Sequence, residues 1–216
     1  MSLVKSVNVI RNLAHLGTEI NHVFAKYGHH RGIIMSRPLL LEYYQNMEYD
    51  WREWTPTQEQ LTQPLQISGH CKPTDYIKTQ VPINKMILAS GTPLGYRFRA
   101  SGDNQYPFDM FVITWQPGQY SGIHYHPVFG CSYLVLQGQI MENLYVLDRE
   151  EYKMKKTGWR VQSQGTVGYI DNNIGAHRIS NIFTTPAISL HIYSPRGAQV
   201  RTLPSNTHTN INYIDS

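Results

Sequence analysis

Apolar side chains recur at three- and four-residue steps near the start of the chain. This stripe predicts a helix over residues 4–26, which Gly28 would end. A second helix is predicted after Pro38, where apolar and aromatic residues cluster again. The apolar positions of the two predicted helices are Val4, Val7, Ile10, Leu13, Ile20, Val23 and Phe24, then Leu39, Leu40, Leu41, Tyr43, Tyr44 and Met47.

From about residue 85 the pattern changes to short runs of β-branched and aromatic residues separated by Gly, Asn, Asp and Pro. These runs predict a mainly β fold, a small antiparallel barrel or sandwich, whose mouth is a common ligand site. Gly158 is predicted to lie in a turn, and Leu136–Gln139 to form the tight connection of a hairpin. The predicted strands are residues 96–100, 109–115, 131–136, 139–147, 167–170 and 186–193.

Between the two regions lies a polar passage, residues 55–82, that four prolines interrupt and that carries no motif of identifiable chemistry. We therefore expect three parts. Residues 1–84 form an N-terminal helical and loop region, residues 85–200 a β-barrel with the functional site, and residues 201–216 a C-terminal tail.

Composition indicates an ordinary folded domain. Of 216 residues, 41% are hydrophobic and 16% charged, and the net charge of +4 comes from scattered lysines and arginines. No basic stripe could therefore follow a phosphate backbone, no apolar run is long enough for a membrane span, and charges interrupt any candidate signal peptide. Two cysteines, Cys71 and Cys131, do not make a disulfide framework. We expect a cytoplasmic protein with neither nucleic-acid nor membrane partners.

His124 and His126 stand two residues apart, just before an apolar run. In an extended strand such residues share a face, so both imidazoles would enter one space. Neutral imidazole is the commonest protein ligand for zinc, iron, copper and nickel. A bare His-x-His is weak evidence by itself, and its surroundings decide whether it forms a metal site.

The surrounding spacing is G-x5-H-x-H-x4-C-x6-G, from Gly118 to Gly138. It resembles the first motif of the cupin superfamily, with Cys131 where many cupins carry a glutamate ligand. Residues 165–181 resemble the second cupin motif and contain His177, although the usual Pro-x-Gly before this histidine is absent.

A Ser-x-His-x-Tyr pattern follows at Ser189, His191 and Tyr193. Together with Cys131, it resembles one cupin family in particular, the thiol dioxygenases of the cysteine dioxygenase type, over roughly residues 96–195. The resemblance implies a cupin-type small β-barrel or jelly roll with N-terminal helices. It also implies oxidation of a small thiol, most simply cysteine, by O2 to a sulfinic acid.

The resemblance implies that His124, His126 and His177 bind Fe(II). Three neutral ligands leave the +2 charge uncompensated, which favours an anionic group such as a thiolate at the open positions. Zinc also accepts three histidines and activates water, so the choice of iron rests on the resemblance alone.

The family also implies a thioether between Cys131 and Tyr193, whereas a free cysteine in a core strand is commonly a small packing residue. Ser189, His191 and Tyr193 would face one way in a strand and could form a relay that orients the tyrosine hydroxyl. A nucleophilic serine is disfavoured, because no strand-to-helix elbow surrounds Ser189.

Substrate recognition is expected at Tyr96, Arg97 and Arg99, because the family carries a Tyr-x-Arg whose arginine binds the substrate carboxylate. Here Phe98 occupies the aligned arginine position, and either arginine could bind the carboxylate. If neither does, a mercapto acid such as 3-mercaptopropionate or an aminothiol becomes the alternative substrate. Two further hypotheses are another cupin metalloenzyme, with Cys131 only packing, and a metal-free or zinc-bearing cupin that binds a ligand without catalysis.

Overall fold

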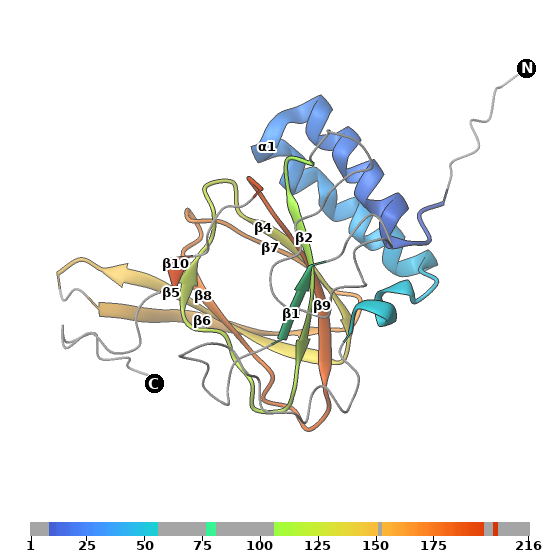
Figure 1. Cartoon of the computed structure of the whole chain (residues 1–216). Coiled ribbons are helices and arrows are strands. Elements are labelled where there is room, and N and C mark those ends of the chain that lie inside the picture. Colours follow the sequence, from blue (N-terminus) through green and yellow to red (C-terminus); the bar gives the residue numbers. More distant parts are fainter. Residues whose placement is uncertain (1–8, 56–76, 81–105, 151–152, 197–200, 203–216) are drawn as a thin grey trace, which may run out of the picture.

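The computed structural model describes residues 9–55, 77–80, 106–150, 153–196 and 201–202. Within them, two five-stranded antiparallel sheets form the body of the molecule, and one long kinked helix lies against one of the sheets (Figure 1). The prediction of a mainly β fold with helical structure at the N-terminus is confirmed.

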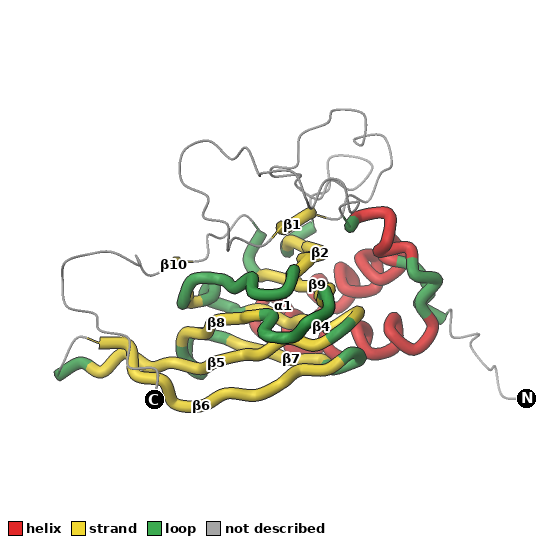
Figure 2. The backbone as a smooth tube through the Cα atoms, turned by 90° about the horizontal axis from the view of Figure 1, so that it is seen from below, coloured by secondary structure: helices red, strands yellow, loops and turns green. Residues whose placement is uncertain are grey.

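We call the first sheet the helix-covered sheet, because helix α1 (Leu13–Asn46) packs on its outer face (Figures 1 and 2). Two of its strands have the bounds that the sequence predicts, residues 109–115 and 167–170. Its spatial order is β1 (Ile77–Gln80), β2 (Asp109–Trp115), β9 (Ala187–Tyr193), β4 (Cys131–Gln137) and β7 (Val167–Ile170).

We call the second sheet the open sheet, because much of its edge strand β6 is exposed. Figure 1 shows it on the far side of the helix-covered sheet from α1. Its spatial order is β10 (Arg201–Thr202), β3 (His124–Tyr125), β8 (Ala176–Ser180), β5 (Gln139–Asp148) and β6 (Lys153–Ser163).

Both faces of the helix-covered sheet are buried, which explains why β4 and β9 are almost continuously buried along their length. Alternate residues point to opposite faces of a strand. Leu190 and Ile192 of β9 thus join the core under α1, whereas Ser189, His191 and Tyr193 point between the sheets. The core under α1 also includes Leu16, Ile20, Phe24, Leu40, Met110, Val112, Leu134 and Leu136.

The helical region differs from its prediction at two places. Among the described residues, the helix begins at Leu13 rather than near residue 4, because Asn12 caps it by accepting a hydrogen bond from the His15 amide at 2.8 Å. Gly28, with φ 72°, breaks the helical path as predicted, and the chain turns back. A short 3₁₀ helix, η1 (Asp50–Trp54), follows α1.

The second helical arm does not begin after Pro38, as predicted, but runs through it. A proline inside a helix removes one amide donor and crowds the carbonyl of the preceding turn. In the turn before the proline, Ser36 and Ser132 donate to the Ile33 carbonyl at 2.7 and 2.6 Å, next to the Ile34 carbonyl that Pro38 leaves without an amide donor. The helix continues through Pro38 to Asn46.

Two turn predictions are wrong. Gly158 lies inside β6, which pairs with β5 along its length. Gly138, at φ 72°, does join β4 to β5 tightly, but these strands belong to different sheets and form no hairpin. The tight connection moves the chain across the interior instead of returning it within one sheet.

Several predictions fall outside the described residues. These are the strand over 96–100, with Tyr96, Arg97 and Arg99, most of the polar passage with Cys71, and most of the C-terminal tail. The division into three parts at residues 84 and 200 stays a prediction. In the described part of the chain, no helix combines the length and apolar character that crossing a membrane requires.

Candidate metal centre

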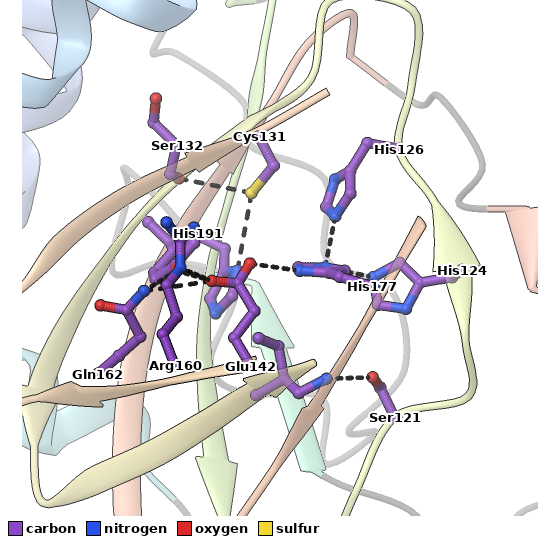
Figure 3. A network of polar contacts seen from close by, with 12 residues as sticks. Ser121, His124, His126, Cys131, Ser132, Glu142, Arg160, Gln162, His177 and His191 are labelled. Atoms are coloured by element: carbon purple, nitrogen blue, oxygen red, sulfur yellow. Dashed lines mark hydrogen bonds and ion pairs between the residues drawn. The ribbon is translucent and has the colours of Figure 1, made fainter. Parts of the chain in front are cut away.

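Three buried histidines converge on one point inside the barrel (Figure 3). His124 on β3 lies directly opposite His177 on β8, and His126 follows the end of β3. The Nε2 atom of His177 lies 3.0 Å from Nε2 of His124 and 2.7 Å from Nε2 of His126. The two motifs that the sequence singled out thus place three imidazole nitrogens together, two from the open sheet and one from the residue that follows β3.

The outer nitrogens of two rings determine where their protons lie. His124 Nδ1 is 2.9 Å from the Gly122 carbonyl, and His177 Nδ1 is 2.8 Å from a Glu142 carboxylate oxygen. Both oxygens only accept, so each Nδ1 carries the hydrogen. In the neutral rings the two Nε2 lone pairs then face each other at 3.0 Å. Such an arrangement is repulsive without a cation, so the donor set fits a divalent metal.

Glu142 on β5 supports this centre, and the sequence reasoning missed it. Its side chain is fully buried. One carboxylate oxygen accepts from His177, and the other accepts from Arg160 Nε at 2.6 Å and from Tyr133 Oη at 2.7 Å. Burial would raise the pKa of Glu142, but the hydrogen bonds from His177 and Arg160 and the positive charge of Arg160 outweigh it and lower this pKa to about 2. Glu142 therefore stays ionised and orients His177.

Tyr133 on β4 carries this network across the interior to the helix-covered sheet. Its hydroxyl donates to Glu142 and accepts from Gln162 at 3.0 Å. Burial and the Glu142 charge raise the pKa of Tyr133 well above its usual value. Gly168 on β7 permits this position, because a Cβ there would collide with the phenol ring. The two sheets are thus joined by hydrogen bonds as well as by packing.

The residues of the Ser-x-His-x-Tyr pattern lie between the sheets. Ser189 Oγ is 2.8 Å from His191 Nε2, and His191 Nδ1 is 3.7 Å from the Cys131 sulfur. Tyr193 pairs directly with Cys131 across β9 and β4. Its ring stacks on that of His126, with centroids 5.6 Å apart, so the helix-covered sheet meets the candidate metal ligands here.

A family model for cysteine dioxygenase type I matches residues 97–205, just over half of the chain. The chain belongs to this family. The resemblance inferred from the motifs is therefore confirmed, and the membership agrees with a metal site at the three histidines.

Two relatives that the chain matches carry the name of this family. Cysteine dioxygenase type 1 of Homo sapiens is 39% identical over 90 residues, 41% of this chain and 45% of that protein. The Danio rerio protein of the same name is 37% identical over 103 residues, 46% of this chain and 51% of that protein. The chain thus spans about half the length of the relatives it matches.

A Bacillus subtilis oxalate decarboxylase is among the solved structures with similarity to this cysteine dioxygenase family member. It is 20% identical, with a TM-score of 0.37, and the alignment covers 45% of this chain and 24% of that one.

Proposed function

We propose that this protein is a non-haem iron(II) thiol dioxygenase that converts a small thiol, in the first place cysteine, into its sulfinic acid. The observation that carries the proposal is the buried set of three neutral histidines with no carboxylate among them. Such a set leaves the charge of a divalent ion uncompensated and favours a thiolate as substrate. Membership of the cysteine dioxygenase family supports it.

The overall reaction is R–SH + O2 → R–SO2H, in which both oxygen atoms go to sulfur. Held by His124, His126 and His177, iron(II) would supply the redox chemistry that lets a thiolate react with O2. Glu142 holds His177 in the tautomer that presents Nε2 to the metal. Tyr193, stacked on His126, is proposed to orient the substrate, with Ser189 and His191 behind it.

The test combines metal analysis with an oxygen-uptake screen over thiols. Single changes of His124, His126 or His177 to Ala should abolish iron binding without unfolding the protein, whereas His22→Ala, at an exposed helix position, should retain it. Wild-type protein with iron should consume O2 with cysteine, 3-mercaptopropionate or cysteamine and form a sulfinic acid. Stoichiometric iron in any of the three variants would remove that histidine from the ligand set. Iron binding without thiol oxidation would indicate another cupin metalloenzyme.

We propose that Arg97 or Arg99, beside Tyr96, binds the substrate carboxylate. A charge-assisted bidentate contact contributes on the order of 1.5–3 kcal/mol, so losing it should raise KM about ten- to a hundredfold for carboxylate-bearing thiols. Cysteamine, which has no carboxylate, should be nearly unaffected. Equal losses for both classes of thiol would contradict the assignment.

We also propose that Cys131 and Tyr193 become joined by a thioether in active protein, which their direct pairing across β4 and β9 supports. The sulfur loses its hydrogen, the phenol ring loses one ring hydrogen, and O2 accepts the two electrons and two protons. Mass spectrometry of a digest should show one reductant-resistant peptide, about two mass units below the sum of the two. Cys131→Ser should lack this peptide yet keep iron. Only separate peptides after aerobic turnover would rule out the link.

A further inference from the structure

Trp115, at the end of β2, begins a chain of hydrogen bonds that leads to Cys131. Its indole Nε1 donates to Ser189 Oγ at 2.8 Å, and Ser189 lies 2.8 Å from His191 Nε2. On the other side of the ring, His191 Nδ1 is 3.7 Å from the Cys131 sulfur, which lies 3.5 Å from the Ser132 carbonyl. The side chains of Trp115, Ser189, His191 and Cys131 are each 2% exposed or less.

The groups at the two ends of this hydrogen-bond series determine which atom donates in each bond. An indole N–H can only donate, so the Ser189 oxygen is the acceptor from Trp115. Among the described residues, the partner that remains for the Ser189 hydrogen is His191 Nε2. That nitrogen is therefore unprotonated, and the neutral ring carries its hydrogen on Nδ1, facing the sulfur. The thiol hydrogen can then go to the Ser132 carbonyl, which only accepts.

We propose that Trp115 is a positioning residue that holds His191 in the Nδ1–H tautomer and so directs its hydrogen to the Cys131 sulfur. This inference rests on the proposed function only in treating Cys131 and Tyr193 as residues of the site. A sulfur that accepts from His191 and faces Ser132 is held at one place on β4, opposite its pairing partner Tyr193. Trp115 thus controls the orientation of the His191 hydrogen through Ser189.

The surroundings of Trp115 make it suited to this role. Its side chain packs in an apolar cluster with Ile113, Val135, Ile140, Ile179 and Ala187. Its carbonyl accepts from the Asn181 side chain at 2.9 Å. The donor is therefore held by packing and by the backbone. The indole hydrogen occupies one side of the Ser189 oxygen, so the hydroxyl hydrogen cannot point there and is directed to His191. With phenylalanine at this position, the hydroxyl hydrogen could turn to that side while the oxygen accepts from His191 Nε2–H, and the opposite tautomer would become available.

The test is 15N NMR of the histidine side chains in the full chain without metal, where long-range proton–nitrogen correlations identify the tautomer of each ring. In the wild type, His191 Nδ1 should resonate as a protonated nitrogen and Nε2 as an unprotonated one. Trp115→Phe should move the Nε2 resonance towards the protonated position. Ser189→Ala, a smaller change, should do the same if the first variant does not fold. Trp51→Phe, which removes another buried indole far from β9 in sequence, should leave His191 unchanged.

A wild-type ring protonated on Nε2 would overturn the inference, as would an unchanged tautomer in both Trp115→Phe and Ser189→Ala. An equal change in Trp51→Phe would also overturn it, because the effect would then reflect general loosening of the core. The proposed function is tested separately by thiol oxidation with iron. A protein with the expected tautomer and no thiol oxidation would keep this inference and lose the proposed function.

Discussion

Replacing Glu142 by glutamine removes one charge from the most connected buried carboxylate near the candidate metal centre while nearly preserving its shape. The carboxylate accepts on both oxygens, from His177 on one side and from Arg160, Tyr133 and Gln162 on the other. A glutamine amide has only one acceptor atom, so its NH2 group must face at least one of these donors. The variant therefore leaves a buried donor unpaired in either orientation.

The size of the effect follows from the pKa of Glu142. This pKa falls from 4.5 to about 2 in the folded protein, where the side chain is fully buried. One pKa unit corresponds to about 1.4 kcal/mol. Relative to the unfolded chain, the fold therefore favours the ionised over the protonated carboxyl group by roughly 3 kcal/mol. We expect Glu142→Gln to lower the free energy of unfolding by about that amount near neutral pH. Because the residue also orients a candidate ligand, metal affinity should fall about 10- to 100-fold.

Urea unfolding of metal-free protein measures the first quantity, and competition with a chelator measures the second. Glu150→Gln is the matched control, since Glu150 is exposed near the end of the same β5–β6 hairpin, and it should change the free energy of unfolding by less than about 0.5 kcal/mol. A Glu142→Gln protein as stable as this control would refute the role assigned to the buried carboxylate. Lower stability with unchanged metal affinity would refute only the orientation of His177.

Three further changes probe the fold. Gly168→Ala should lower the free energy of unfolding by about 1–3 kcal/mol because its Cβ would collide with Tyr133, whereas Gly158→Ala, with nothing near its Cβ, should not. Asn12→Ala should cost about 0.5–2 kcal/mol in urea unfolding through loss of the α1 cap. Burial would raise the pKa of Asp171, but hydrogen bonds from neighbouring amides and a tyrosine hydroxyl lower it. The stability advantage of wild type over Asp171→Asn should therefore shrink as pH falls below about 4; an advantage independent of pH would contradict this.

The two-residue alternation of side chains and the motif spacing predicted those strands in which each face has the same surroundings along its length. Strands β2 and β7 have the predicted bounds, and the common face of Ser189, His191 and Tyr193 follows from the two-residue period. The convergence of His124 and His126 follows from the same period. These features depend on local geometry, which the sequence carries directly.

The remaining features depend on contacts between distant segments. Strand β6 is polar and largely exposed, so it lacks an apolar alternation, and its pairing with β5 is what keeps Gly158 extended. A tight turn at Gly138 has the same local signature whether it closes a hairpin or links two sheets. Glu142 shares a strand face with Ile140 and Leu144, and this interruption of an apolar face was the signal available for it. The partners that keep it buried lie on other strands.

Because the site is divided between two sheets, selection can act separately on the candidate metal ligands and on the other residues of the site. The candidate ligands His124, His126 and His177 all belong to, or directly adjoin, the open sheet, whereas Cys131, His191 and Tyr193 belong to the helix-covered sheet. A substitution under α1 acts first on the second group and reaches the candidate ligands only through contacts such as those of Tyr133 and Tyr193. Loss-of-function variants of that kind would accumulate as metal-loaded, inactive protein. Metal content alone would then be a poor measure of whether a variant of this chain is functional.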